Sequence, residues 1–215
     1  MSKSLDLAQL RRDYKQAELL ENSIHADPLQ QFKHWFQEAL EAEVIEPNAM
    51  CLSTVLDQKP HSRVVLLKGL ESNGFVFFTN YDSAKGQQLM ANPDCALVFW
   101  WGELERQVRI EGSVEKISAE ESDFYFQSRP RASQLGAWAS PQSEIISDRC
   151  LLEQKLALLE EKYTNQKVLR PDHWGGFRVI PTAIEFWQGR PSRLHDRLCF
   201  QLDPQGNWQK YRLAP

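Results

Sequence analysis

The chain has 215 residues, of which 42% are hydrophobic and 25% are charged, and its formal net charge at pH 7 is -4. This is the composition of a globular protein long enough to bury a core, and its acidic balance argues against a general nucleic-acid binder. No stretch reaches the length of a membrane span, and residues 1–15 lack the apolar core of a signal peptide. We therefore expect a cytoplasmic protein with no membrane partner.

The first predicted elements are an arm and a helix. Residues 1–26 are polar, and we predict a mobile N-terminal arm there, followed by a single domain over residues 27–215. Asp27 and Pro28 are typical of an N-cap and the first helical position, and apolar residues follow them at helical spacing. This helix should end near Pro47.

The middle of the chain alternates apolar runs with turn residues, which predicts strands. The expected elements are strands at residues 49–56, 61–70, 75–80, 95–101 and 106–117, a hairpin turn at 71–74 and a short helix at 83–91. Asn73 and Gly74 supply the turn signal of that hairpin. Because the strands follow one another through hairpins, we predict a mostly antiparallel sheet that closes into a barrel.

Helices interrupt the strands after residue 117. Ser118 and Glu121 form a capping-box pattern, which predicts a helix that ends near Ser128. Ser140 and Pro141 are typical of a helix start, and we predict a long helix over residues 142–163. The last predicted strands are residues 176–180, 183–188, 193–203 and 208–213. The fold class expected from these elements is mainly β with added helices.

The chain contains none of the motifs GxGxxG, GxxxxGK[ST], GxSxG and HExxH. Its four cysteines form no CxxC pair and lie near no histidine at metal-ligand spacing, so we expect free thiols in a reducing compartment and no metal site. Cationic and amide side chains instead gather at strand ends and helix termini. That inventory suits the binding of phosphates and of a planar cofactor that supplies its own chemistry.

The segment with the sequence RLHDR, residues 193–197, is the most informative part of the chain. If it is a strand, Arg193, His195 and Arg197 share one face. Such a face repels itself unless an anionic or electron-rich ligand lies against it. A solvated edge strand, whose basic residues discourage aggregation, is the alternative interpretation.

Two further groups of side chains could bind phosphates. Thr79 and Lys85 flank the turn into the predicted helix at 83–91, where a hydroxyl and an ammonium at a helix N-terminus favour an anion. An ordinary helix cap is the alternative there. Tyr125 and Arg129 lie on one helix face and Ser133 follows, which indicates either a second phosphate site or a Tyr–Arg packing pair.

Three other polar residues are candidates for ligand contacts. Arg63 and Lys68 flank an apolar run, and regular alternation places them on opposite faces unless a bulge lies between them. A core strand with charged ends is the alternative, and the pattern by itself favours it. Gln107, near the start of the predicted strand at 106–117, could hydrogen-bond a ring carbonyl or nitrogen, or could be a surface amide.

Several motifs, taken in chain order, resemble the pyridoxamine 5'-phosphate oxidase family. They are RVVLLK at 63–68, FTN at 78–80, LERQV at 104–108, SRPR at 128–131, GAW at 136–138, WGGF at 174–177, FWQG at 186–189, RLHDR at 193–197 and RLAP at 212–215. RLHDR joined to FWQG is the most specific combination. The resemblance runs from about Arg11 to residue 215, which is nearly the whole chain.

The resemblance implies an FMN-binding split β-barrel with flanking helices, working as a homodimer with sites at the subunit interface. It implies oxidation of pyridoxamine 5'-phosphate and pyridoxine 5'-phosphate to pyridoxal 5'-phosphate, the activity of a pyridoxal 5'-phosphate synthase. FMN would accept the hydride, and O2 would reoxidise the flavin to give H2O2. Because the same fold hosts flavin reductases and non-catalytic flavin, haem or pyridoxal-phosphate binders, those functions stay as alternatives.

The resemblance also implies site residues by position. Those implied to bind FMN are Arg63, Val64, Val65, Leu66, Leu67, Lys68, Phe78, Thr79, Lys85, Gln107, Gln142, Ser143, Trp187 and Arg197. Those implied to bind the substrate are Arg11, Tyr14, Lys68, Tyr125, Arg129, Ser133, Arg193 and His195. The implied catalytic residues are Arg193, His195 and Arg197, and residues 11–14 are implied to close over the substrate.

The sequence departs from the family pattern at two positions. Ala84 precedes Lys85 where the family often has Arg, which removes a charge-assisted contact worth about 1.5–3 kcal/mol. We therefore expect weaker FMN binding unless Arg63 and Ser143 suffice. Phe78 stands where the family often has Tyr, and this change costs little if the FMN contact there is made by the backbone.

Overall fold

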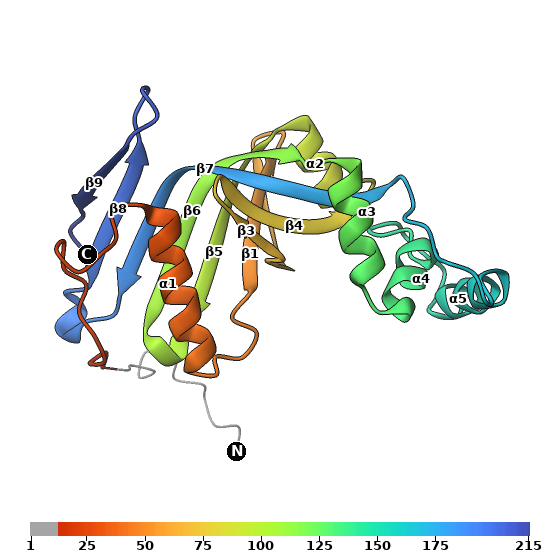
Figure 1. The fold of residues 1–215 in the computed structure, drawn as a ribbon, viewed down its shortest axis with the longest axis horizontal. Helices are drawn as coiled ribbons and strands as arrows, with labels where there is room; N and C mark the ends of the chain where they lie inside the picture. The colour runs from red at the N-terminus through yellow and green to blue at the C-terminus, as the bar shows by residue number, and fades with distance from the viewer. Residues whose placement is uncertain (1–12) are drawn as a thin grey trace, which may run out of the picture. The chain divides into compact units, whose positions relative to one another are not determined.

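A computed structural model of the chain describes residues 13–215, whose course is drawn in Figure 1. The helices in this range are α1 (Pro28–Glu41), α2 (Ala84–Ala91), α3 (Ala119–Ser128), α4 (Arg131–Ala139) and α5 (Cys150–Lys162). The strands are β1 (Ala49–Leu56), β2 (Lys59–Leu66), β3 (Gly69–Glu71), β4 (Gly74–Asn80), β5 (Asp94–Trp101), β6 (Arg106–Lys116), β7 (Trp174–Gln188), β8 (Asp196–Leu202) and β9 (Trp208–Arg212). None of these helices is long and apolar enough to cross a membrane.

The strands form one sheet with the hydrogen-bonded order β2-β1-β5-β6-β7-β4-β3, and β8 and β9 continue from β7 as a separate branch. The pairs β1–β2, β3–β4, β4–β7, β7–β8 and β8–β9 are antiparallel. This antiparallel sheet with flanking helices confirms the predicted fold class. The hydrogen-bonded path has two ends, β2 and β3, so it is open rather than a closed ring.

The two ends of the path are joined by a two-residue link, Leu67 and Lys68. The Leu67 N–H donates to the carbonyl of Asn48 at 2.8 Å, and the Lys68 N–H donates to the carbonyl of Val76 at 2.8 Å. The link therefore changes its hydrogen-bonding partner between one residue and the next. For this reason the single strand predicted at residues 61–70 is wrong, and the segment forms β2 and β3 instead.

The chain divides into two compact units. Of the described residues, the first unit contains 13–47, Val98–Ile110 and Ala183–Pro215, and the second contains Asn48–Leu97 and Glu111–Thr182. Strands β5, β6 and β7 each contribute to both units. The mobility of residues 1–26 and a single domain over residues 27–215 stay predictions.

The core of the first unit is aromatic. Phe32 of α1 packs against Phe99 and Trp101 at ring-centroid distances of 4.9 and 5.9 Å, and Trp35 lies edge-on to Phe186 at 5.2 Å. These α1 residues are spaced to share one helix face, which is why the helix buries that face. The predicted N-cap is confirmed, because the Asp27 carboxylate accepts the first-turn N–H of Leu29 at 2.8 Å.

Helix α1 ends earlier than predicted. It stops at Glu41, and the following residues Glu43 and Glu46 have φ angles of 53° and 46°. A left-handed backbone is incompatible with an α-helix. The prediction that the helix continues to near Pro47 is therefore wrong by about one and a half turns.

The second unit contains the helices α2 to α5. Its buried cluster of Phe126, Leu135, Val168 and Trp174 packs α3 and α4 against the start of β7. The capping box at Ser118 is confirmed: the Ser118 hydroxyl accepts the Glu121 N–H at 3.0 Å, and the Glu121 carboxylate accepts the Ser118 N–H at 2.9 Å.

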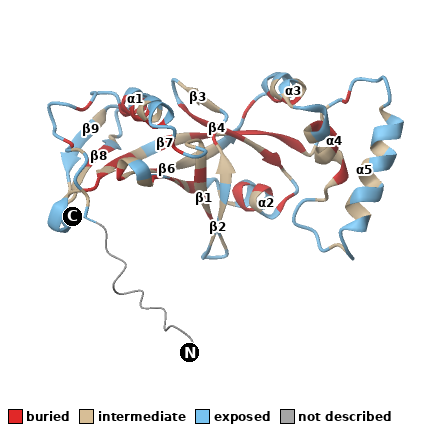
Figure 2. Cartoon of the chain, turned by 90° about the horizontal axis from the view of Figure 1, so that it is seen from below, coloured by how far each residue is buried: buried red, intermediate tan, exposed pale blue. Residues whose placement is uncertain are grey.

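Two predictions on later elements are wrong. The predicted long helix at residues 142–163 starts only at Cys150, because Ser140 is the C-cap of α4 and Ser143 has a φ of 77°, which no α-helix tolerates. Helix α5 has no buried residue and is drawn largely in pale blue and tan in Figure 2. The strands predicted at residues 176–180 and 183–188 are one continuous strand, β7.

Candidate functional site

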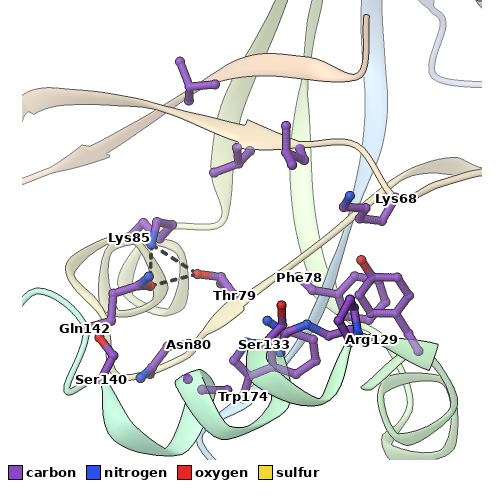
Figure 3. A pocket seen from close by; sticks show the side chains of 17 residues that line it. Lys68, Phe78, Thr79, Asn80, Lys85, Arg129, Ser133, Ser140, Gln142 and Trp174 are labelled. Carbon is purple, nitrogen blue, oxygen red and sulfur yellow. Dashed lines mark hydrogen bonds between the residues drawn. The ribbon is translucent and has the colours of Figure 1, made fainter. Parts of the chain in front are cut away.

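The second unit contains a pocket of about 610 Å³, whose lining side chains are drawn in Figure 3. Strands β2 and β4, helices α2, α3 and α4, and the start of β7 supply its walls. The predicted site residues in its lining are Val64, Val65, Leu66, Lys68, Phe78, Thr79, Lys85, Tyr125, Arg129, Ser133 and Gln142. The volume is in the range of small-molecule and cofactor sites.

Lys85 forms a cationic group at one side of the pocket (Figure 3). Its Nζ donates to Oε1 of Gln142 at 2.7 Å, to Oγ1 of Thr79 at 3.2 Å and to Oγ of Ser83 at 3.3 Å. Ser83 is the N-cap of α2, so the ammonium lies beside the positive end of that helix. Burial and the nearby positive charge of Arg63 lower the pKa of Lys85. This group of donors at a helix start favours an anion such as a phosphate.

Arg63 does not line the pocket, but its positive charge acts on Lys85. Its guanidinium donates to Oε1 of Gln88 at 2.6 Å, to Oγ1 of Thr54 at 2.8 Å and to the carbonyl of Leu52 at 3.3 Å. All three partners are neutral, and burial lowers the pKa of Arg63. Arg63 and Lys85 therefore place positive charge at this end that their neutral partners do not compensate.

Arg129 provides a second cationic group, which Figure 3 shows beside Ser133 and Trp174. Its guanidinium carbon lies 4.5 Å from the centre of the Trp174 ring. Within residues 13–215 the Nη1 atom is buried and has no hydrogen-bond partner, and burial lowers the pKa of Arg129. A buried donor without a partner is costly for a protein, so this guanidinium is suited to an anionic ligand.

Three aromatic rings form a stack at this side of the pocket. Phe78 and Tyr125 lie 3.8 Å apart with an interplanar angle of 16°, and Phe78 and Trp174 lie 5.5 Å apart at 12°. Burial raises the pKa of Tyr125, so its hydroxyl stays protonated at neutral pH. Phe78 is packed here through its ring, so the absence of a hydroxyl at this position leaves the stack intact.

The other predicted site residues do not line this pocket. Leu67 is only 7% exposed, and Ser143 is exposed in the left-handed turn after α4. Arg11 lies outside the described residues. The remaining predicted residues belong to the first unit: Tyr14, Gln107, Trp187, Arg193, His195 and Arg197.

Within the first unit, Tyr14, Trp187 and His195 form an aromatic group. The His195 ring centre lies 4.6 Å from that of Trp187 and 5.7 Å from that of Tyr14. The backbone N–H of Arg190 donates to Nδ1 of His195 at 3.1 Å. In the neutral ring the proton is therefore on Nε2. Burial and the positive charge of Arg193 lower the pKa of His195, so the neutral form dominates at pH 7.

The prediction that Arg193, His195 and Arg197 share a strand face is wrong. Strand β8 starts only at Asp196, and Pro191–Arg193 forms a short 3-10 turn in which Ser192 and Arg193 have φ angles of 57° and 61°. This left-handed turn breaks the alternation that the prediction assumed. Arg193 is exposed, and His195 lies between the turn and the strand.

Arg197 and Trp187 are directly opposite each other in the β7–β8 register. Arg197 forms a two-pronged ion pair with Glu185 at 2.8 and 2.9 Å, and its Nη1 donates to the carbonyl of Ala214 at 3.0 Å. Gln107 is half-buried in β6. The structure thus brings Trp187 and Arg197 together, with Arg197 held by a carboxylate that the sequence analysis did not single out.

Sequence reasoning also missed several residues around the pocket. Gln88 and Thr54 accept hydrogen bonds from Arg63, and the Trp174 ring packs against the guanidinium of Arg129. Trp174 belongs to the motif WGGF, which was a signal available in the sequence. Gln88 and Thr54 had no such signal, because their role depends on contacts between distant parts of the chain.

Two family models match the chain. Residues 36–163 match the model described as pyridoxamine 5'-phosphate oxidase, and residues 174–215 match that of the pyridoxine 5'-phosphate oxidase C-terminal dimerisation region. The chain belongs to the pyridoxamine 5'-phosphate oxidase family. This confirms the predicted family and the expectation of an enzyme.

Curated relatives extend the match to nearly the whole chain. The chain is 60% identical over 212 residues to the pyridoxine/pyridoxamine 5'-phosphate oxidase of Microcystis aeruginosa, covering 98% of this chain and 99% of the relative. It is 62% identical over 212 residues to the protein of the same name from Synechocystis sp., with the same two coverages.

Solved structures agree on the fold. PhzG from Burkholderia lata 383 is 27% identical to this chain with a TM-score of 0.87, covering 94% of this chain and 100% of that one. A pyridoxamine 5'-phosphate oxidase-related, FMN-binding protein from Nostoc punctiforme is 16% identical with a TM-score of 0.69, covering 86% and 97%. The second likeness supports the fold alone.

Proposed function

We propose that this protein oxidises pyridoxine 5'-phosphate and pyridoxamine 5'-phosphate to pyridoxal 5'-phosphate in an FMN-dependent reaction, with O2 as electron acceptor and H2O2 as a product. With the amine substrate, water is also consumed and ammonia is released. The observation that carries the proposal is one pocket with two separate cationic groups, around Lys85 and around Arg129. One ligand phosphate fits each group. The names of the 60%-identical relatives support the same reaction.

The residues present fit an FMN phosphate near Lys85. In the proposal Lys85, Thr79 and Gln142 bind that phosphate, with Arg63 adding positive charge, and residues 64–66 line the wall beside the flavin. Lys68 and Phe78 also line this pocket. The remaining FMN residues are assigned on the resemblance alone: Leu67, Gln107, Ser143, Trp187 and Arg197. When bound, FMN supplies the hydride acceptor and the site of reaction with O2.

The chain's own residues orient the substrate in this proposal. Arg129, Ser133, Tyr125 and Lys68 bind the substrate phosphate, since they line the second cationic side of the pocket. Arg193 and His195 hold the pyridine ring, and neutral His195 offers its Nε2 proton to a substrate oxygen or nitrogen. No protein nucleophile takes part, which agrees with the missing hydrolase motifs.

The assembly and location belong to the same proposal. We infer a cytoplasmic homodimer with its sites at the subunit interface, which the matched dimerisation region at residues 174–215 supports. Gel filtration with light scattering should give twice the mass of one chain, and a monomer at micromolar concentration would contradict this inference.

A spectroscopic experiment tests the reaction. We expect the purified protein, reconstituted with FMN if necessary, to lose its flavin absorbance when pyridoxine 5'-phosphate is added without oxygen. Air should restore the absorbance while pyridoxal 5'-phosphate and H2O2 appear, with no added NAD(P)H. A flavin that stays oxidised would overturn the proposal and favour a non-catalytic binder or a flavin reductase.

A substitution tests the FMN phosphate group. Changing Lys85 to Met should weaken FMN binding about 10- to 100-fold, because it removes a charge-assisted hydrogen bond worth about 1.5–3 kcal/mol. The dissociation constant is measured by quenching of flavin fluorescence. Lys162→Met is the matched control, since Lys162 lies over the Tyr163 ring on α5 and outside the pocket lining. Equal affinities of the Lys85 variant and the control would contradict the assignment.

A further inference from the structure

The segment at residues 14–19 is held in the first unit by its backbone. The N–H groups of Lys15 and Gln16 donate to Oε2 of Glu105 at 2.8 and 3.1 Å. The N–H of Leu19 donates to Oδ2 of Asp196 at 3.0 Å. Two carboxylates therefore bind three backbone donors of one short segment, which has no secondary structure of its own.

Two arginines bind the carbonyls of the same segment. Arg190 donates to the carbonyl of Ala17 at 3.0 Å, and Arg212 donates to that of Leu19 at 2.8 Å. Arg212 also pairs with the Glu21 carboxylate at 2.6 Å. Because the contacts with Ala17 and Leu19 use backbone carbonyls, they fix the path of the segment independently of its side chains.

Glu105 is the most enclosed of these partners, with an exposed fraction of 3%. It adopts a left-handed backbone with a φ of 55°, and its carbonyl accepts the N–H of Gly189 at 2.7 Å. A non-glycine residue in this conformation is strained and persists only where its surroundings demand it. The carboxylate of this buried residue accepts hydrogen bonds from the N-terminal segment.

The position of Tyr14 follows from the two bonds to Glu105, because Tyr14 directly precedes Lys15. Its ring lies 5.7 Å from the rings of both Trp187 and His195. Gly189 permits this approach, since a Cβ there would lie only 2.7 Å from Cγ of Tyr14. His195 is thus held by a ring on one side and by the Arg190 N–H at Nδ1.

We propose that Glu105 is a positioning residue. Its carboxylate fixes Lys15 and Gln16, which places Tyr14 against His195 and sets the direction of the Nε2 proton, while Asp196 fixes the far end of the segment. The effect on turnover rests on the proposed function. The effect on the segment itself does not depend on it.

Amide hydrogen exchange over residues 13–19 tests the anchoring directly. In the FMN-loaded protein, Glu105→Ala should speed exchange at Lys15 and Gln16 at least about tenfold, because an amide that loses its hydrogen bond opens more often. Glu105→Gln should restore most of the protection, since an amide oxygen still accepts. Glu18→Gln is the matched control, because Glu18 is an exposed residue of the same segment and pairs only loosely with Arg190 at 3.6 Å.

Kinetics test the positioning. Glu105→Ala should lower kcat/KM for pyridoxine 5'-phosphate about 10- to 100-fold, with FMN affinity within about twofold of wild type, as expected for a misplaced orienting group. In a double-mutant cycle with Tyr14→Ala the two losses should not add, because both act through the Tyr14 ring. Full additivity would overturn the proposal, since a merely structural role of Glu105 predicts independent effects.

A second variant guards against misfolding of the Glu105 variants. Gln16→Pro removes one donor N–H from an exposed residue and leaves Glu105 in place. It should speed exchange at Lys15 and lower kcat/KM in the same direction as Glu105→Ala. Unchanged exchange in both Glu105→Ala and Gln16→Pro would overturn the anchoring. A wild-type protein without oxidase activity would instead overturn the proposed function, and the exchange experiment would still decide the role of Glu105.

Discussion

Replacing Arg129 by Met should lower kcat/KM for pyridoxine 5'-phosphate about 10²- to 10³-fold, while FMN affinity stays within about threefold of wild type. Removing one partner of a buried charged pair costs about 2–5 kcal/mol, which corresponds to this range. The loss should appear mainly in KM, because a phosphate that does not react is bound equally in the ground state and the transition state.

The same substitution should leave the ligand-free protein at least as stable as wild type. Nη1 of Arg129 is buried without a hydrogen-bond partner among residues 13–215, and burial lowers the pKa of this guanidinium. Exchanging a partly buried charge whose hydrogen bonds are incomplete for an apolar side chain is often neutral or stabilising. Met keeps a flexible, polarisable contact with the Trp174 ring. Substrate binding and stability should therefore move in opposite directions, as is common at binding sites.

Steady-state kinetics and thermal unfolding without ligand check both parts. Arg131→Met is the matched control: Arg131 starts α4 two residues later, but its guanidinium donates to the carbonyls of Tyr163 and Gln166 at 2.6 and 3.0 Å. This control should lose stability and keep its KM. The site assignment is wrong if Arg129→Met retains the wild-type KM, or if its melting temperature falls as far as that of the control.

Local signals in the sequence were sufficient for much of the fold. The N-cap at Asp27 and the capping box at Ser118 depend on groups within three residues of each other, and both are confirmed. The hairpin at Asn73 and Gly74 is confirmed for the same reason, with β3 and β4 paired on either side of it. Such elements can be predicted because their stabilising contacts lie within the segment itself.

Features that depend on distant partners could not be predicted in this way. The break at Leu67 and Lys68 exists because one N–H pairs with Asn48 and the next with Val76. Likewise, β8 starts later than predicted because Ser192 and Arg193 have a left-handed backbone. The spacing of apolar residues does not predict such a turn. Side chains alternate between the two faces only along a regular strand. The alternation fails where tertiary contacts impose an irregular backbone.

The candidate site also divides into residues that the sequence indicated and residues that depend on distant contacts. The pocket residues on β2, β4, α3 and α4 were accessible through the motif resemblance, whereas patterning alone left a structural alternative open for the charged candidates among them. The buried partners of the charges, such as Gln88 for Arg63 and Glu185 for Arg197, come from other parts of the chain. Sequence reasoning therefore named many of the residues that line the pocket but not the residues that hold them.

Replacing Arg193 by Ala should reduce kcat at least about 10²-fold, the scale of a positioned group that assists proton movement, with FMN affinity within about threefold of wild type. Arg193 is exposed and is held in a left-handed backbone next to Ser192, a conformation that costs about 1–2 kcal/mol per residue. A left-handed backbone costs Ala about as much conformational free energy as it costs Arg. This variant therefore removes the guanidinium without relaxing the turn. Arg149→Ala is the control, because Arg149 is an exposed arginine paired with Glu153 on α5.

The pH profile separates this role from a general loss of structure. Burial and the positive charge of Arg193 lower the pKa of His195, so Arg193→Ala removes one of the two causes and should raise that pKa. If the neutral form of His195 is the active one, kcat/KM falls as the pH drops through this pKa. The acid limb should then lie at higher pH in Arg193→Ala than in wild type or Arg149→Ala, and the His195 ring signal in an NMR titration should move with it. If the acid limb is not shifted and turnover equals that of wild type, the assignment of Arg193 to the site is wrong.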